Sequence, residues 1–198
     1  MMENKKRCQW CQNTVLTLKY HDNEWGIPVH DDKIHFEFLT LEVMQCGLNW
    51  TMILKKRDIL RQCFENFDFY KIALYDEKDI ERIMKTEGMI KSERKIKAVI
   101  NNAKLYIDII KEHESFDKYL WNYSQFKTLI YINHKSSITT QNYLSNIISK
   151  DLKKRGFKYL GSITIYAHLQ ACGIINDHEP DCFMYDYINN NFPINFVK

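Results

Sequence analysis

The sequence has few of the residues that interrupt regular secondary structure. Its 198 residues include only three prolines and six glycines, so long segments contain no helix-breaking residue. It also lacks an alternating strand series and an internal repeat, which argues against sandwiches, barrels and solenoids. Apolar residues instead recur at every third or fourth position in most segments. We therefore expect an all-α protein in which residues 1–198 form a single unit.

Segments that direct a protein to a membrane are also missing. The N-terminal sequence MMENKKRCQWCQ has basic residues but no apolar run after them, unlike a signal peptide. The longest uncharged stretch, residues 159–176, contains His, Gln, Ser and Thr and is marginal in length for a span, which favours a buried helix. We expect a soluble, cytoplasmic protein, in which six cysteines would remain buried, metal-bound or idle thiols and would form no disulfide scaffold.

Apolar spacing and capping residues predict where the helices begin and end. Asp31 or Asp32 can cap one helix and Gly47 can end it, and Ser115 can cap another. A loop is expected at 134–142. The expected helices cover residues 34–46, 58–67, 76–85, 92–113, 115–126, a segment ending near 155, and 162–172.

Basic residues gather in the sequence KDLKKRGFK, residues 150–158, although the net charge of the chain is only +3. Gly156 and Gly161 permit a sharp turn between two helices, which makes residues 141–172 a candidate helix-hairpin-helix. Backbone N–H groups at such a turn can bind a DNA phosphate while Lys154, Arg155 and Lys158 supply positive charge. The alternative is an ordinary helical hairpin with a solvated basic face. A solvated face is also the alternative for a second basic cluster at 91–97.

Glu42 stands in an otherwise uncharged stretch, between Glu37 and Lys55. In the expected helix it lies at the edge of an apolar stripe that runs from Ile34 to Gln45, where a carboxylate needs a polar or cationic partner or must reach back to solvent. Aromatic residues that could surround it are also common core residues; they are Trp10, Tyr20, Trp25 and Trp50. An acid among flat rings would suit a flat, positively charged ligand.

The order of several motifs resembles the DNA-3-methyladenine glycosylase I family of bacterial alkyl-base repair enzymes. The matching segments span residues 8–182 and read CQW, YHDNEWG, LEVMQCGLNWTMILKKR, FENFD, IKSERKIKAVINNAKLY, YLWNY, LKKRGFKYLG and LQACGIINDH. The resemblance implies an all-α fold of the helix-hairpin-helix glycosylase superfamily. It also implies a monomeric, monofunctional enzyme of base excision repair, which flips N3-methyladenine out of alkylated double-stranded DNA, hydrolyses its N-glycosidic bond, and leaves an abasic site and free 3-methyladenine.

The resemblance also implies one structural Zn²⁺ that ties residues 8–21 to residues 178–182. Its ligands would be Cys8, His21, His178 and Cys182. A competing interpretation uses Cys11, because Cys8 and Cys11 form a C-x-x-C pair. Asp177 is expected to be a neighbour that orients His178.

The lesion pocket of the family corresponds to Glu42 as the catalytic residue, with Tyr20 and Trp50 stacking on the base and Trp10 and Trp25 nearby. The family's segment that fills the gap left by the flipped nucleotide corresponds to Gly47 and Leu48. Departures from the family pattern put the pocket lining and the substrate range in question; they are Thr17, Val43 and Met44.

Other functional classes remain open from the sequence. The chain could be a zinc-stabilised DNA-binding module without catalysis, or a glycosylase with an altered range of alkyl-purines. A zinc hydrolase is disfavoured, because protein ligands would fill the zinc tetrahedron and leave no position for water.

Overall fold

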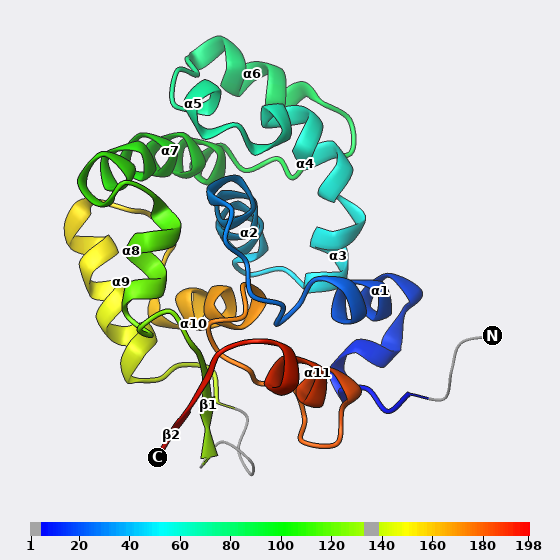
Figure 1. Cartoon of the computed structure of the whole chain (residues 1–198). Coiled ribbons are helices and arrows are strands. Elements are labelled where there is room, and N and C mark those ends of the chain that lie inside the picture. The colour runs from blue at the N-terminus through cyan, green and yellow to red at the C-terminus, as the bar shows by residue number, and fades with distance from the viewer. Residues whose placement is uncertain (1–4, 133–138) are drawn as a thin grey trace.

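The computed structural model describes residues 5–132 and 139–198, and the fold is mostly helical, as expected. Figure 1 shows the elements, which are η1 (Gln9–Asn13), α1 (Val15–Asn23), α2 (Asp32–Gln45), α3 (Trp50–Lys55), α4 (Arg57–Cys63), η2 (Glu65–Phe67), α5 (Phe69–Ile72), α6 (Glu77–Lys85), α7 (Glu93–His113), α8 (Phe116–Asn122), β1 (Thr128–Tyr131), α9 (Tyr143–Arg155), α10 (Ser162–Ala171), α11 (Phe183–Asn191) and β2 (Ile194–Val197). Within the described ranges, no helix is long and apolar enough to cross a membrane.

Helix α2 lies in the middle of the molecule, with other helices arranged around it (Figure 1). The expected single apolar stripe was wrong, because α2 is buried on nearly all sides from His35 to Met44. Ile34, at the start of the expected stripe, is 41% exposed, whereas Phe36 and Leu39, outside that stripe, are in the core. Glu42 therefore lies on a central helix that has no solvated face at its level.

Capping residues fix the ends of α2. The Asp31 carboxylate accepts a hydrogen bond from the Ile34 backbone N–H at 2.9 Å. At the other end, the Nζ of Lys95 on α7 donates to the carbonyls of Met44 and Cys46, each at 2.7 Å. A cation at a helix C-terminus is stabilising. Lys95 is thus a buried structural residue of the basic cluster at 91–97, and burial lowers the pKa of its ammonium group.

Ser115 caps α8 as expected, since its Oγ accepts from the Lys118 backbone N–H. Helix α9 ends at Gly156, whose φ of +101° is the left-handed conformation that glycine adopts freely. The turn 156–161 then leads into α10, and α10 packs against both α9 and α2. Most of the loop expected at 134–142 lies outside the described residues.

A small parallel sheet corrects the expectation of a purely helical chain. Strand β1 pairs with β2 in the register Thr128 to Ile194 through Tyr131 to Val197. The C-terminal segment after Cys182 forms α11 and β2. Helix α11 contacts the segment that contains Asp177 and His178 through Asn176, and its Tyr185 lines the functional site.

Candidate active site and metal-ligand cluster

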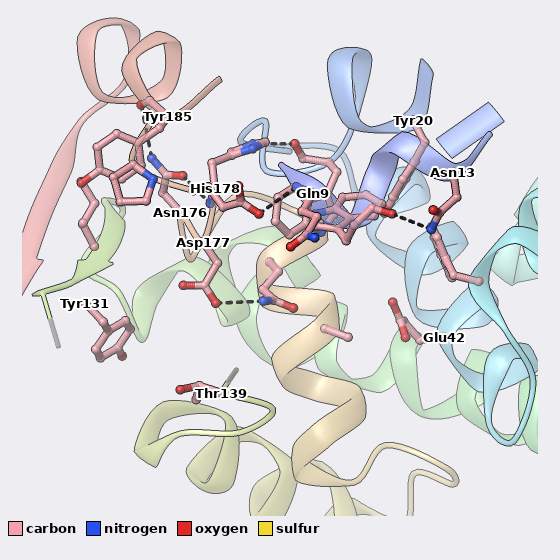
Figure 2. Close-up of a pocket in the computed structure, with 18 of the residues that line it drawn as sticks. Gln9, Asn13, Tyr20, Glu42, Tyr131, Thr139, Asn176, Asp177, His178 and Tyr185 are labelled. Atoms are coloured by element: carbon pink, nitrogen blue, oxygen red, sulfur yellow. Dashed lines mark hydrogen bonds between the residues drawn. The ribbon is translucent and has the colours of Figure 1, made fainter. Parts of the chain in front are cut away.

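A cavity of about 780 Å³ opens between the N-terminal elements, α2, α3, α10 and the segment before α11. All of the residues predicted to form the lesion pocket line it: Trp10, Tyr20, Trp25, Glu42 and Trp50. Figure 2 shows Glu42 on one side of this cavity, with Asp177, Tyr131 and Thr139 on another. The chain brings these side chains together from distant segments, as a ligand-binding cavity requires.

Aromatic rings form the wall near Glu42. The centroids of Tyr20 and Trp50 are 5.2 Å apart with planes inclined by 55°, and those of Trp10 and Trp25 are 4.9 Å apart at 72°. Burial, and then the nearby Glu42, raise the pKa of the Tyr20 hydroxyl well above its usual value. Tyr20 therefore stays neutral, and the wall presents uncharged flat surfaces.

Glu42 is the buried acid of this cavity, with an exposed fraction of 7%. No donor among residues 5–132 and 139–198 makes a hydrogen bond with its carboxylate. Burial alone raises its pKa from 4.5 to about 8. An uncompensated buried carboxyl group that faces a cavity is matched to a ligand that brings a positive charge or hydrogen-bond donors.

The wall opposite Glu42 includes Asp177, which was expected to orient His178. Its carboxylate instead binds residues of α10, and the Trp25 carbonyl faces His178 Nε2. Asp177 accepts hydrogen bonds from the Tyr166 hydroxyl and, at 2.8 Å, from Gln170 Nε2. Both donors belong to α10. Gln170 and Asp177 lie in the motif LQACGIINDH, which was the available signal for this wall. Further lining residues are Gln45, Ile130, Tyr131, Ala167, Asn176 and Tyr185.

The departures from the family pattern do not line the described part of the cavity. Val43 and Met44 are in the hydrophobic core on the other faces of α2. Thr17 is buried, and its hydroxyl donates to the carbonyl of Cys11 at 2.7 Å. Thr17 also completes the capping box with Thr14 at the start of α1. These residues therefore support the wall from behind.

The predicted metal ligands form one buried cluster. One ligand atom from each of Cys8, His21, His178 and Cys182 lies within 4.8 Å of the others. Cys8 Sγ is 3.5 Å from His178 Nδ1, and Cys182 Sγ is 3.4 Å from His21 Nε2 and 3.8 Å from His178 Nδ1. Neighbouring ligands of a tetrahedral zinc ion are about 3.3–3.8 Å apart for the usual Zn–N and Zn–S bond lengths. The spacing fits zinc.

Neighbouring groups orient both histidines. His21 Nδ1 is 2.9 Å from an Asp22 carboxylate oxygen, and Arg7 holds the same carboxylate at 2.9 Å. His178 Nε2 is 3.1 Å from the carbonyl oxygen of Trp25, which can accept its N–H. Each ring thus directs its other nitrogen at the cysteines, which is the usual arrangement around metal-binding histidines.

Cys11 lies outside this cluster, although it is fully buried. Its thiol donates to the carbonyl of Cys8 at 3.0 Å. The backbone N–H of Glu179 lies 3.2 Å from Cys8 Sγ and points to the same sulfur as His178 Nδ1. The geometry of the C-x-x-C pair therefore assigns only Cys8 to the ligand cluster.

The candidate DNA-binding residues lie around the turn between α9 and α10 and at the end of α2. Lys154, Lys158 and Gly161 are exposed, and Gly156 is half-buried. Arg155 is different, because it forms ion pairs with Glu112 at 2.7 Å and Asp151 at 2.8 Å. Gly47 is exposed, and Leu48 is half-buried against the core.

Comparison with known proteins gives consistent matches. Residues 10–185 match the sequence model of the methyladenine glycosylase family. The chain is 40% identical over 189 residues to DNA-3-methyladenine glycosylase 1 of Escherichia coli (strain K12), covering 91% of this chain and 97% of that protein.

Solved structures with the same fold include 3-methyladenine DNA glycosylase I (TAG) from Staphylococcus aureus, in work on its recognition of 3-methyladenine. It has a TM-score of 0.85 and 34% identity, covering 89% of this chain and 95% of that chain. A variant of 3-methyladenine DNA glycosylase I in complex with 3-methyladenine has a TM-score of 0.85 and 34% identity, covering 89% of this chain and 96% of that chain.

Proposed function

Because the chain belongs to the methyladenine glycosylase family, we propose that it is a monofunctional DNA glycosylase of base excision repair. It hydrolyses the N-glycosidic bond of N3-methyladenine in alkylated double-stranded DNA and leaves an abasic site. The observation that carries this function is the buried, uncompensated Glu42 carboxyl group beside Tyr20 and Trp50. That combination matches a flat base with a positive charge.

Selection of the lesion follows from this charge. Methylation at N3 makes the adenine in DNA cationic, whereas normal adenine is neutral. In a buried cavity, a cationic base offsets the cost of ionising Glu42, and a neutral base does not. Tyr20 and Trp50 provide faces on which the flipped base stacks, with Trp10 and Trp25 nearby in the same cavity. Glu42 accepts hydrogen bonds from the edge of the base.

Bond cleavage needs little activation of the leaving group, because the cationic base departs as a neutral molecule. The sugar develops positive charge as the bond from its anomeric carbon to the base nitrogen breaks, and the Glu42 carboxylate stabilises that charge. Water then adds to the anomeric carbon and loses a proton to solvent, which leaves the neutral abasic sugar. None of the residues that line the described cavity is a lysine, so the wall offers no amine for a covalent intermediate with the sugar, and simple hydrolysis is the expected chemistry.

We also propose that Cys8, His21, His178 and Cys182 hold one structural Zn²⁺. Burial of all of these residues and the ligand spacing of 3.4–3.8 Å support this role. These residues would fill all four positions of a tetrahedral ion, so a bound ion would contribute its binding energy to folding and would leave no position for water in hydrolysis. Because Trp25 and His178 also line the cavity, the ion would fix that wall relative to α1.

DNA contact is assigned to the turn 156–161 as a helix-hairpin-helix. Lys154 and Lys158 are exposed beside Gly156 and Gly161, where backbone N–H groups can meet a phosphate. Arg155 has a smaller part than expected, because carboxylates of this chain already bind it. Gly47 and Leu48 fill the gap in the duplex, at a loop that Lys95 anchors through the Cys46 carbonyl. The enzyme acts as a monomer.

The deciding experiment measures which bases the purified chain releases from duplex DNA treated with a methylating agent. Chromatography should find free 3-methyladenine, and release should fall strongly for Glu42→Gln. Release of a different alkyl-purine would identify an altered range. Binding to DNA with no base released would leave only the non-catalytic DNA-binding module.

A further inference from the structure

A second group of metal-type ligands lies in the helical core, apart from the Cys8 cluster. One ring nitrogen from each of His35 and His168 and the Sγ of Cys172 lie within 4.8 Å of one another. All of these side chains are 0% exposed. They do not line the described cavity, so the proposed glycosylase chemistry does not use them.

Three of the four ring nitrogens of this group lack hydrogen-bond partners among the described residues. In the part of the chain that the structure describes, His35 Nδ1 and both His168 nitrogens are buried without a partner. Cys172 Sγ contacts the Leu169 carbonyl, at the long distance of 3.8 Å. Orphaned buried polar atoms are uncommon, and several of them around one point indicate a missing ligand.

The sequence supplies this group in a pattern that occurs twice. His168 and Cys172 are four residues apart at the end of α10, so they lie on one face of the helix. His178 and Cys182, in the proposed zinc cluster, have the same His-x-x-x-Cys spacing. A histidine from the N-terminal part of the chain joins each pair, His35 here and His21 there, and Cys8 is a further member of the proposed zinc cluster only.

His35 is also oriented as metal-binding histidines usually are. Its Nε2 is 3.3 Å from a carboxylate oxygen of Asp117, and the backbone N–H of Asp117 donates to Asp32 at 2.8 Å. Such carboxylate-histidine pairs fix the ring orientation and strengthen the other nitrogen as a ligand. Burial, with a contribution from His35, holds the pKa of His168 well below its usual value, which keeps its ring in the neutral form.

We propose that His35, His168 and Cys172 form a second metal site, which binds one Zn²⁺ between α2 and α10. Imidazole and thiolate ligands select zinc-like ions over Mg²⁺ or Ca²⁺. Charge balance favours a divalent ion, because one thiolate and the adjacent Asp117 carboxylate together neutralise it. This site does not depend on the proposed function.

Binding requires a proton to leave and the ligands to move slightly. Burial raises the pKa of the Cys172 thiol to about 12, so Zn²⁺ replaces its proton, which passes to solvent as the Zn–S bond forms. The ligand atoms can be as far as 4.8 Å apart, so they draw together by about 1 Å to reach zinc spacing. Since the group has no exposed surface, the ion enters while the chain folds.

A bound ion would join the helices that form the two sides of the cavity. Helix α2 carries His35 and Glu42, and α10 carries His168 and Gln170. Figure 1 shows these helices as neighbours near the centre of the molecule, and they are in direct contact. The site would thus stabilise the cavity without touching the base.

The test counts zinc ions per chain. The full chain is unfolded in denaturant in the presence of a chelator and refolded with excess Zn²⁺. Unbound metal is then removed, and the protein is examined by native mass spectrometry. Wild type should carry two Zn²⁺, and His168→Phe and Cys172→Ala should each carry one. Cys63→Ala is the matched control, because Cys63 is a buried cysteine outside both ligand groups, and this variant should keep two.

Circular dichroism shows which variants fold. If His168→Phe does not fold, the zinc count of Cys172→Ala decides the test. A wild-type chain that saturates at one Zn²⁺, lost in Cys182→Ser, overturns the second site and leaves the first intact. Two ions that persist in both His168→Phe and Cys172→Ala also overturn it. If His168→Phe and Cys172→Ala each lose one Zn²⁺, and Cys182→Ser loses the other, the result supports the two sites separately.

Discussion

Gly26 packs directly against His178. A Cβ atom placed on Gly26 would lie 2.6 Å from His178 Nε2, closer than real side chains approach, and the φ of Gly26 is +82°. The glycine of the motif YHDNEWG is therefore the residue that lets the C-terminal histidine reach the N-terminal cluster. Because Gly26 has no side chain, the N-terminal and C-terminal segments can pack against each other here.

Gly26→Ala should displace His178 and lower both zinc content and thermal stability. Gly88→Ala is a matched control, because Gly88 has a similar φ of +76° but no atom within 4 Å of the position that an alanine methyl group would occupy. Both variants suffer the same left-handed backbone strain, so only the clash differs. Equal melting temperatures and equal zinc contents for the two would contradict the role given to Gly26.

Cys182→Ser should remove the proposed structural zinc and reduce thermal stability sharply, because a closed metal site contributes its binding energy to folding. Cys11→Ser provides the comparison, since Cys11 is a buried neighbour outside the ligand cluster. Metal analysis and thermal unfolding of both proteins check this. Zinc that is lost from Cys11→Ser and kept in Cys182→Ser would reverse the choice between the two cysteines.

Glu42→Gln should make the protein more stable at alkaline pH while it impairs excision. The folded-state pKa of Glu42, about 8, is above its ordinary value of 4.5, so the stability it contributes is full below 4.5 and is lost as pH rises through 8. Glutamine does not titrate. The variant should therefore gain on the order of 2–4 kcal/mol relative to wild type between pH 4 and 9.

Urea unfolding at pH 4 and pH 9 measures that gain, with the exposed Glu87→Gln as a control that should show none. Single-turnover excision by Glu42→Gln should fall about 10- to 100-fold, the cost of losing a hydrogen bond to a charged group. A variant that excises like wild type would remove Glu42 from the mechanism even if its stability behaves as expected.

Trp50→Ala should weaken binding of free 3-methyladenine by about 1–3 kcal/mol, the usual contribution of a base stacked on an aromatic ring. Calorimetric titration measures this change directly. Phe69→Ala, which removes a core aromatic ring outside the cavity, controls for general loss of packing. An unchanged affinity in Trp50→Ala would place the base elsewhere in the cavity.

Lys154→Ala should weaken binding to any duplex, damaged or not, and should reduce the slope of log affinity against log salt by about one. Lys78→Ala, on α6, changes another exposed lysine, far from Lys154 in the sequence, and should leave the slope unchanged. Arg155→Ala should chiefly reduce stability, because it removes the ion pairs with Glu112 and Asp151. A larger salt-slope change for Arg155→Ala than for Lys154→Ala would contradict this assignment.

The sequence was most informative where local chemistry decides the structure. Asp31 and Ser115 cap helices where expected, and Gly156 ends α9 as its freedom at positive φ allows. The parallel pairing of β1 with β2 could not be read, because each strand has four residues and its partner is remote in sequence. Local patterns do not encode such pairings.

The same distinction applies to the site. Glu42 stood out because an acid in an apolar helix is locally anomalous, but its complete burial depends on helices that surround α2. Arg155 looked available for DNA because its partner Glu112 lies in another helix. The core group of His35, His168 and Cys172 was missed for the same reason: only the packing of α10 on α2 brings the first histidine to the other two ligands.

The cavity walls combine residues from opposite ends of the sequence, and this has a kinetic consequence. His21 and Cys182 are separated by 161 positions, and Cys8 and His178 by 170. Contacts of such long sequence separation form slowly. During synthesis, Tyr20, Trp25 and Glu42 leave the ribosome well before Asp177 and His178 exist. The cavity therefore cannot be completed before the C-terminal segment that contains Asp177 and His178 has been synthesised.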